Sequence, residues 1–288
     1  HYLFLFYKYI WQNRRDYNAV FCHMSPLYVI FGAPFWRLCK KKVSLWYTHR
    51  NVDFKLRVAV KLADIIFTAS PEGFRLKGKK VKIMGHGIDT ARFKKKGEAF
   101  LRATPVIISV GRITPIKNLD VLVEATFLLQ KQGTEVLVRF IGAPITESDE
   151  LCEAKLKDLI RLKNLEKQVI FAGSVPNKDI AVEYWKADIS INLAPTGGID
   201  KSVLESFAAG VPAIVSNEAF RPTLGAYSRD FIFEQGNAKD LAEKIKKYLD
   251  TGADEKAKIQ QFLQSQVEDR FSLDQLASHI STHLKNGN

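Results

Sequence analysis

Cysteine is scarce in this chain of 288 residues, and no CxxC pair occurs. The three cysteines, Cys22, Cys39 and Cys152, form an odd and scattered set that is typical of a reducing compartment. This set predicts neither a disulfide framework nor a structural zinc site. His279 and His283 stand four residues apart, but no glutamate lies between them and no third ligand accompanies them, so we expect no bound metal.

Long apolar runs are also missing. The longest one, residues 2–11, is interrupted by Lys8 and has about half of the ~20 residues that a membrane-spanning helix needs. A basic segment followed by a small-residue cleavage site, which marks a secretory signal, is not visible. The share of hydrophobic residues is 46% and that of charged residues 26%, as in soluble globular proteins. We therefore expect a cytoplasmic protein, attached at most peripherally to the inner face of a membrane.

Two common phosphate-binding fingerprints are absent. The spacing GxxxxGK[ST] does not occur, although Lys201 and Ser202 match its last two positions. No GxGxxG follows an apolar run. These absences argue against an ordinary P-loop NTPase and against a typical dinucleotide-dependent enzyme, so no cofactor is expected.

Acidic residues are few in the first third of the chain. The first 100 residues carry 20 Lys and Arg against 6 Asp and Glu, whereas the other 188 carry 23 against 25. Such a basic region attracts an anionic membrane, an anionic lipid-linked substrate or nucleic acid, or else it is a solvated face without a partner. Nucleic acid is the weakest of these, because no RNP-like aromatic pattern, zinc finger or helix-turn-helix accompanies the charge. The amphipathic residues 1–16 fit either a membrane interface or core packing.

What the chain does contain is a regular alternation of short apolar runs and helical patterns. This alternation is typical of α/β proteins with parallel sheets. Strands are expected at residues 19–22, 43–47, 65–68, 81–84, 106–110, 136–141, 168–172, 189–193, 213–216 and 231–234, and helices at 1–16, 27–38, 52–62, 119–130, 149–162, 177–186, from 202, and at 238–249, 254–269 and 273–284. The polar run at residues 94–97 is the best domain boundary. We expect domains at 1–97 and 98–250, with the helices of 251–288 returning to the first domain.

A strand, two glycines and a helix follow one another between residues 188 and 212. Gly197 and Gly198 allow a ligand to approach the main chain, and the helix that begins near Ser202 offers free N–H groups and a positive dipole end. Glu205 lies one turn inside this helix, close enough to bond a neutral hydroxyl. A nucleotide would fit, with its phosphates on the amides and its ribose on the acid. The alternative is that the glycines only close a turn.

Two cations follow the apolar run at 106–110. Arg112 and Lys117 flank a proline-stiffened loop that leads into a helix, so both can converge on one anion, and Arg112 can bind it in a bidentate manner. Chance placement of two bases in a loop is the alternative. Three other polar loops follow expected strands. They are residues 173–176, residues 85–89 with alternating glycines, and the segment around His49. The segment around His49 lies at the carboxyl end of a strand, where αβ proteins bind ligands.

Three motifs, GRITPIKN, FAGSVP and GGIDKSVLESFAAGVP, occur in this order, and together they resemble the donor half of the retaining glycosyltransferases of family 4. HMSPLYV, WYTHR, SPEGF and GHGID-TARF extend the resemblance over residues 17–288. It implies the GT-B architecture, with two Rossmann-like domains. By this likeness Arg112 and Lys117 neutralise the donor diphosphate, and the amides of residues 202–204 meet the phosphate. Glu205 holds the ribose, residues 173–176 touch the base, and His49 lies by the reacting centre.

The resemblance implies a complete set of site residues. His49, Arg112 and Lys117 form the catalytic set, and no residue is expected to bind a metal. The donor-binding set is Gly87, Gly111, Arg112, Lys117, Gly173, Val175, Gly197, Gly198, Asp200, Lys201, Ser202, Val203, Leu204 and Glu205.

Two features depart from the family pattern. An acid that contacts the donor sugar commonly lies eight positions before Glu205, where this chain has Gly197, so Asp200 or Lys201 is expected to take over that contact. The strand, glycine-rich loop and αβ unit that usually open the first domain are not found before His1. The first domain is therefore expected to be incomplete. Three explanations are open: the chain is a fragment, its first domain is unusually small, or a second subunit completes the domain.

The function expected from these observations is transfer of a sugar, with retention, from a nucleoside diphosphate sugar to a hydroxyl of a lipid-linked or glycan acceptor. The expected partners are the nucleotide sugar, the acceptor and an anionic membrane surface, and not nucleic acid. The alternatives are a nucleotide-sugar-binding fragment or subunit without catalysis of its own, and an epimerase acting on a nucleotide sugar.

Overall fold

The computed structural model describes residues 1–49, 51–71, 73–94, 104–195 and 197–285. The chain forms two compact units, one made of His1–Gly87 with Leu273–Asn288 and the other of Ile88–Ser272. The domain boundary expected at residues 97 and 98 lies outside the described residues and stays a prediction. Of the last two helices, α12 (Ala253–Phe271) belongs to the second unit and α13 (Leu273–Lys285) to the first.

The first unit is built on a parallel sheet with the strand order β1-β2-β3-β4 in the described residues. In register, Ala19 pairs with Lys42, Ser44 with Ile65, and Ile66 with Val81. All four strand predictions here are confirmed to within one residue at either end. The elements before α13 are α1 (Tyr2–Gln12), β1 (Ala19–His23), α2 (Pro26–Leu38), β2 (Lys42–Trp46), α3 (Phe54–Leu62), β3 (Ile65–Thr68) and β4 (Val81–Ile83).

The two faces of this sheet are covered by different helices. Val43 and Leu45 are fully buried in the core that α2 and α3 complete, because alternate residues of a strand point to opposite faces. Trp46 and Phe67 point to the other face and pack against Leu276 and two further apolar residues of α13, Ile280 and Leu284. The last segment of the chain thus completes the first unit.

Helix α1 is only partly packed. Phe6 contacts Trp36 of α2 in an edge-to-face arrangement, and Ile10 is buried. The other large apolar side chains of this helix are exposed, to 88% at Tyr2, 69% at Phe4, 67% at Tyr9 and 57% at Trp11. The predicted helix is confirmed, although it ends at Gln12 rather than at residue 16, and it combines a narrow packed face with a wide exposed apolar face.

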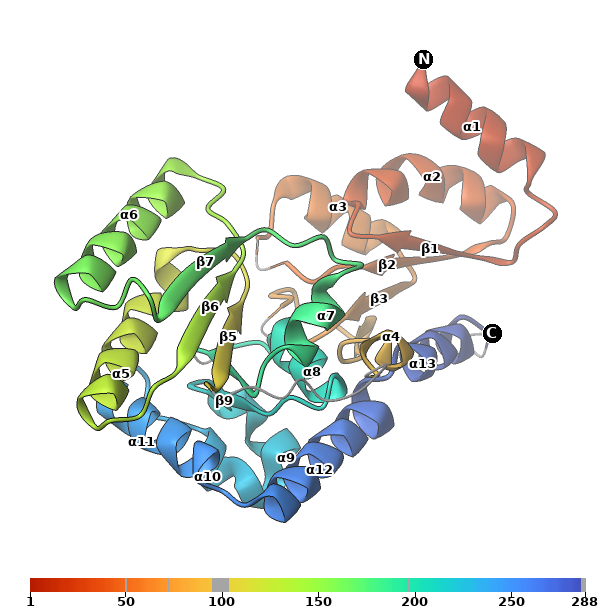
Figure 1. Cartoon of the computed structure of the whole chain (residues 1–288). Helices are drawn as coiled ribbons and strands as arrows, with labels where there is room; N and C mark the ends of the chain where they lie inside the picture. The colour runs from red at the N-terminus through yellow and green to blue at the C-terminus, as the bar shows by residue number, and fades with distance from the viewer. Residues whose placement is uncertain (50, 72, 95–103, 196, 286–288) are drawn as a thin grey trace. The chain divides into compact units, whose positions relative to one another are not determined.

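The second unit contains a parallel sheet with the strand order β7-β6-β5-β8-β9 in the described residues. Figure 1 shows α5 and α6 on one side of β5 to β7, with α7 and α8 on the other side. Its elements before α12 are α4 (Thr90–Phe93), β5 (Val106–Val110), the 3-10 turn η1 (Pro115–Lys117), α5 (Leu119–Lys131), β6 (Leu137–Ile141), α6 (Glu147–Leu162), β7 (Val169–Gly173), α7 (Ile180–Trp185), β8 (Ile189–Asn192), α8 (Lys201–Ala208), β9 (Ala213–Val215), η2 (Glu218–Phe220), α9 (Arg221–Leu224), η3 (Gly225–Tyr227), α10 (Ser228–Phe231) and α11 (Ala238–Leu249).

One continuous hydrophobic core stabilises this unit. Strand β5 is almost entirely buried, as expected for a strand in the middle of a doubly wound sheet. Trp185 connects α4 to the rest of the unit by a hydrogen bond, which its indole N–H donates to the carbonyl of Phe93 at 2.8 Å.

One predicted strand is wrong. The sequence predicts a strand at residues 231–234, but Ile232 forms only a single bridge with Val215. Helix α10 continues to Phe231, and Asn237 caps α11 by accepting a hydrogen bond from the N–H of Asp240 at 3.0 Å. Phe231, the first residue of the predicted strand, thus belongs to α10, and pairing with β9 is limited to the bridge at Ile232.

Candidate active site

The candidate site lies where the order of strands in the second sheet reverses direction. From β5 the chain moves outward through β6 and β7, and then returns to place β8 on the other side of β5. Ile107 pairs with Ile189, so β5 and β8 are parallel neighbours and their carboxyl ends meet at one edge. Ligands of open α/β sheets bind at such a switch point. The two loops that the sequence singles out, residues 111–118 and 193–200, follow these two strands.

Two glycines let the loops after β5 and β6 approach each other closely. The N–H of Gly111 donates to the carbonyl of Ile141 at 2.9 Å, and Gly111 has a φ of +141°. Gly142 has a φ of +146°, and a Cβ there would lie 2.8 Å from the carbonyl carbon of Gly111 and closer still to its oxygen. Only glycine fits this position without strain. The contact fixes the main chain directly before Arg112.

Arg112 is oriented by an acid at the start of α6. Its Nε lies 3.8 Å from Oδ2 of Asp149, and about half of the Arg112 side chain is exposed. Asp149 is 3% exposed and forms a capping box with Thr146. Burial opposes ionisation of Asp149, but hydrogen bonds from Thr114, Thr146 and the Ile145 backbone hold the pKa of its carboxyl below the ordinary value. Asp149 therefore remains charged and holds one edge of the guanidinium.

Lys117 reaches from the loop after β5 to the loop after β8. Its Nζ donates to Oδ2 of Asp200 at 2.8 Å, and the same oxygen accepts a hydrogen bond from Nδ2 of Asn192, also at 2.8 Å. The side chains of Lys117 and Asp200 are 21% and 33% exposed. The contact brings two predicted site residues together from positions 83 residues apart. Arg112 contacts the start of α6 instead.

The loop that carries the two predicted glycines is held from several sides. Asn217 accepts a hydrogen bond from the N–H of Gly197 at 3.4 Å and donates to the carbonyl of Gly198 at 3.0 Å. Asn118 donates to the carbonyl of Leu193 at 3.3 Å, and Ser216 to that of Ala194 at 2.9 Å. Side chains that follow β5 and β9 thus fix the main chain of this loop.

Helix α8 begins directly after Asp200, as the sequence predicts. Asp200 occupies the N-cap position, but its side chain caps none of the amides of the first turn. The N–H of Val203 donates to the Asp200 carbonyl at 3.2 Å, and the carbonyl of Ser202 accepts from the hydroxyl of Tyr184 at 2.8 Å. Leu204 is fully buried. Of the amides expected to meet a phosphate, that of Val203 is therefore already occupied by the chain.

Glu205 is a buried acid at this helix. It is 9% exposed, and Lys201 Nζ lies 4.0 Å from its Oε1. Burial raises the pKa of its carboxyl, and the charges of Lys201 and Arg92 offset this only in part. Since the folded state then binds the proton more tightly than the unfolded state, the charged carboxylate costs stability at neutral pH. This cost disappears as the pH falls through the raised pKa.

The loop after β7 lies at the same edge of the sheet. The carbonyl of Gly173 accepts from the N–H of Gly142 at 2.8 Å, and Val175 packs against the core. Asn177, just beyond this loop, accepts a hydrogen bond from Arg92 at 3.1 Å. Arg92 also has a buried Nε without a hydrogen-bond partner among the described residues.

Sequence reasoning missed several residues that shape the site. Neutral amide side chains and an arginine on a four-residue helix carry no strong signal of their own. A polar residue at the end of an apolar strand was the available clue for Asn192 and Asn217. The missed residues are Arg92, Asp149, Asn192 and Asn217.

Two predicted site residues lie in the other unit. His49 follows β2, is exposed, and its Nδ1 accepts a hydrogen bond from the N–H of Asn51 at 3.1 Å. Gly87 lies where a Cβ would be 2.7 Å from Leu276 of α13, so close packing requires glycine there. The roles expected for these two residues stay predictions.

Known proteins resemble this chain most clearly in the second unit. A family model described as glycosyl transferases group 1 matches residues 91–263, which is more than half of the chain. The chain belongs to this family. The matched region contains all of the site residues described in the second unit.

Three curated relatives are named as glycosyltransferases. WcaL of Escherichia coli (strain K12), named for colanic acid biosynthesis, is 26% identical over 214 residues, 72% of this chain and 51% of the relative. AmsK of Erwinia amylovora, named for amylovoran biosynthesis, is 29% identical over 170 residues, 57% of this chain and 40% of the relative. A Caenorhabditis elegans alpha-1,2-mannosyltransferase named with GDP-Man is 32% identical over 133 residues, 44% of this chain and 28% of the relative. The chain spans about half the length of WcaL.

Solved structures show the same fold. HepE of Anabaena, crystallised with UDP and glucose, superposes with a TM-score of 0.77 at 17% identity, over 98% of this chain and 81% of HepE. A glycosyltransferase of Rickettsia africae gives a TM-score of 0.76 at 18% identity, over 99% of this chain and 82% of the other. These likenesses confirm an α/β fold with parallel sheets of the GT-B type.

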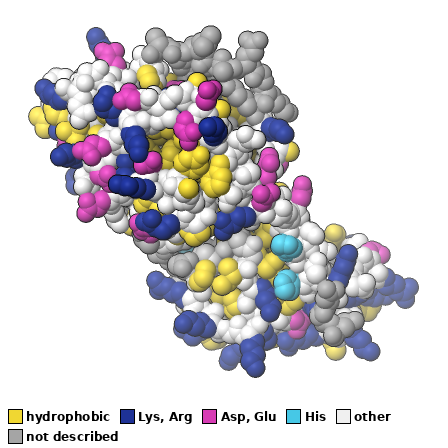
Figure 2. Space-filling model, turned by 90° about the horizontal axis from the view of Figure 1, so that it is seen from below, with side chains coloured by type: hydrophobic (Ala, Val, Ile, Leu, Met, Phe, Trp, Pro, Cys, Tyr) yellow, Lys and Arg dark blue, Asp and Glu magenta, His cyan; other side chains and the backbone are white. Residues whose placement is uncertain are grey.

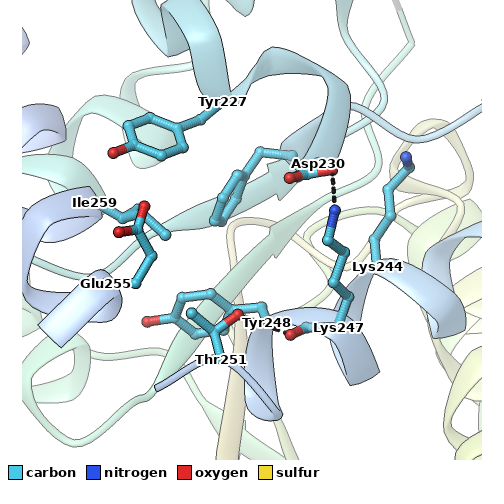
Figure 3. Close-up of a pocket in the computed structure, with 9 residues that line it drawn as sticks. Tyr227, Asp230, Lys244, Lys247, Tyr248, Thr251, Glu255 and Ile259 are labelled. Atoms are coloured by element: carbon cyan, nitrogen blue, oxygen red, sulfur yellow. Dashed lines mark hydrogen bonds and ion pairs between the residues drawn. The ribbon is translucent and has the colours of Figure 1, made fainter. Parts of the chain in front are cut away.

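Two hollows of the second unit are lined mainly by helices. One of about 160 Å³ lies between α10, α11 and α12, where Figure 3 shows Lys247 reaching Asp230. Their charged atoms are 2.7 Å apart, and Lys244 pairs with Asp240, so this hollow offers no excess positive charge to a phosphate. The other, of about 520 Å³, lies along η1, α5 and α6 and includes Cys152. Burial and nearby acids raise the pKa of this thiol, which makes it a weak nucleophile.

The described ranges contain neither a metal-binding cluster nor a membrane-spanning helix. There, no three His, Cys, Asp or Glu side chains are grouped so that they could hold a metal ion. No helix in the described part of the chain combines the length and the hydropathy required to span a bilayer.

Proposed function

We propose that this chain transfers a sugar, with retention at the anomeric carbon, from a nucleoside diphosphate sugar to a hydroxyl acceptor. The observation that carries the proposal is the Lys117 ammonium at the β5/β8 switch point, 2.8 Å from Asp200, with Arg112 on the same loop. Cations held in a fixed arrangement stabilise the charge that develops on a departing diphosphate. No divalent metal is then needed. The complexes of HepE with UDP and glucose support a nucleotide sugar as the substrate.

We propose the following roles for the other site residues. Glu205 accepts a hydrogen bond from a ribose hydroxyl, and the main chain after Gly173 contacts the base. The free amides at the start of α8 contact the phosphate with the help of the helix dipole. We propose a catalytic role for His49, which follows β2 in the first unit. The names of WcaL and AmsK support a glycan acceptor, and the name of the Caenorhabditis elegans relative, which includes Man(3)GlcNAc(2)-PP-Dol, supports a lipid-linked one.

A panel of nucleotide sugars tests this proposal. We expect one donor, for example UDP-glucose or GDP-mannose, to raise the melting temperature, because a ligand present at 100 times its Kd stabilises a fold by about 2.7 kcal/mol. Glu205→Gln should melt higher than wild type at neutral pH without ligand, since a buried charge is removed, and yet gain less from the donor. Asp158→Asn, an exposed acid on α6, is the matched control. A chain that responds to no nucleotide sugar would contradict the proposal.

Product analysis separates the alternatives. Transfer or hydrolysis of the donor by the chain excludes a binding-only role, whereas a change of sugar configuration without an acceptor would identify an epimerase. Binding without any turnover would favour the fragment or subunit.

We also propose that the first unit attaches peripherally to anionic membranes. Residues 1–87 carry 16 Lys and Arg against 4 Asp and Glu. Figure 2 shows Lys and Arg gathered on the unit that carries the histidines, and mixed signs on the other unit. The exposed aromatic side chains of α1 add the apolar contact that interfacial helices use, and basic residues add attraction to anionic lipid.

Vesicle sedimentation tests the attachment. Binding should require anionic lipid such as phosphatidylglycerol and should weaken at high salt, since surface attraction is screened. The double variant Phe4→Ser, Trp11→Ser should bind several-fold less. Leu162→Ser, which removes an exposed apolar residue of the second unit, should bind like wild type. Equal binding to neutral and anionic vesicles would contradict the proposal.

A further inference from the structure

The carboxylate of Asp200 lies in an unusual position for a helix N-cap. An N-cap aspartate normally accepts a hydrogen bond from an amide of the first turn, but this one accepts none. Its Oδ2 is instead occupied by Lys117 and Asn192, each at 2.8 Å. Asn192 is 5% exposed, so the carboxylate is held from the inside of the sheet edge. Oδ1 accepts no hydrogen bond from any residue that the structure describes.

Among the described residues next to Asp200, Lys201 is a cation and Ser202 has its hydroxyl 3.5 Å from Nδ2 of Asn192. Gly197 and Gly198 have no side chains, and their main chain is held by Asn217. The other acid of this segment, Glu205, is one turn further along and almost fully buried. The free Oδ1 of Asp200 is therefore the best acceptor for a sugar hydroxyl next to Lys117.

The same carboxylate opposes binding of a bare diphosphate. It already neutralises Lys117, and a phosphate oxygen that approaches this ammonium meets a like charge 2.8 Å from it. A donor that still carries its sugar can offset this repulsion, because a hydroxyl donates a hydrogen bond to the carboxylate. The spent nucleotide has no such hydroxyl and keeps only the repulsion.

We infer that Asp200 is a specificity-determining residue that makes the site prefer the nucleotide sugar over the free nucleoside diphosphate. Oδ1 accepts a hydrogen bond from a hydroxyl of the donor sugar, while Oδ2 remains bonded to Lys117 and Asn192. The inference rests on the proposed function and extends it to the release of the product. It requires no covalent step.

Calorimetric titration of Asp200→Asn with two matched pairs, UDP with UDP-glucose and GDP with GDP-mannose, tests this inference. Asparagine keeps the size and the N-cap preference but loses the charge. We expect the free diphosphate to bind about tenfold more tightly than to wild type, and the advantage of the nucleotide sugar over it to fall about tenfold or more, as for a lost hydrogen bond to a charged group. Product inhibition should rise accordingly. Asp158→Asn should change neither affinity.

The outcomes separate this inference from the function on which it rests. An unchanged ratio of the two affinities in Asp200→Asn overturns the inference and leaves the function intact. Weaker binding of the free diphosphate also overturns it, because Asp200 would then only position Lys117. If wild type binds neither pair, the proposed function fails, and the inference fails with it. Asp200→Ser, which can also cap α8, replaces the asparagine variant if the latter does not fold.

Discussion

Alanine at Arg112 or at Lys117 is expected to lower donor turnover about a hundredfold, which is the usual loss when one group that stabilises developing charge is removed. Both cations lie on the loop that follows β5, and each is paired with an acid, Arg112 with Asp149 and Lys117 with Asp200. Such fixed groups need little rearrangement at the moment of reaction. The measurement is the steady-state rate of transfer or hydrolysis of the donor that stabilises wild type.

Two exposed cations of the same unit serve as controls. Arg161→Ala and Lys258→Ala each remove a residue that pairs with a neighbour on its own helix, and both variants should turn over like wild type. The melting temperatures of Arg112→Ala and Lys117→Ala should stay within a few degrees of wild type, because both side chains are partly exposed. Normal turnover in both alanine variants would refute the site described here.

The second large effect is expected at Gly142. Alanine there would strain a backbone with a φ of +146° and would collide with the carbonyl of Gly111. Strained backbone and overpacking each cost roughly 1–3 kcal/mol, so we expect a loss of about 3 kcal/mol of stability. For a unit of this size that loss lowers the melting temperature by about 10 °C.

Gly252→Ala is the matched control for this glycine. Gly252 has a φ of −64°, and a Cβ there meets nothing within 4 Å, so the substitution should leave the melting temperature unchanged. If Gly142→Ala melts like wild type, the loops after β5 and β6 do not approach each other as closely as described.

Most of the fold was predictable from the sequence because the signals are local. The buried run of β5 is recognised by its apolar residues alone, and its predicted bounds are confirmed at both ends. Residues 231–234 are equally apolar, yet they form no strand, since the length of α10 and the cap of α11 decide the conformation there. A pattern of apolar residues indicates that a segment is buried, but it does not indicate whether the segment pairs with a neighbouring strand.

The part of the site that depends on local patterns was predictable from the sequence, whereas the part that depends on the strand order was not. Arg112, Lys117 and Glu205 follow or lie within recognisable strand and helix patterns, so their positions on the sheet edge could be inferred. The pairing of Lys117 with Asp200 depends on which strands are neighbours, and the strand order is not written in local periodicity. The positions of Asn192 and Asn217 at strand ends were a clue to these residues, but their hydrogen-bond partners depend on the same strand order.

The two units differ in how the chain runs through them. The second unit is one unbroken segment, Ile88–Ser272, with a core of its own, whereas the first unit needs α13 to cover Trp46 and Phe67. During synthesis on the ribosome, the second unit can therefore fold as soon as it has emerged, since domains generally fold as units. Until residues 273–285 have been made, Trp46 and Phe67 on one face of the first sheet lack the helix that packs against them.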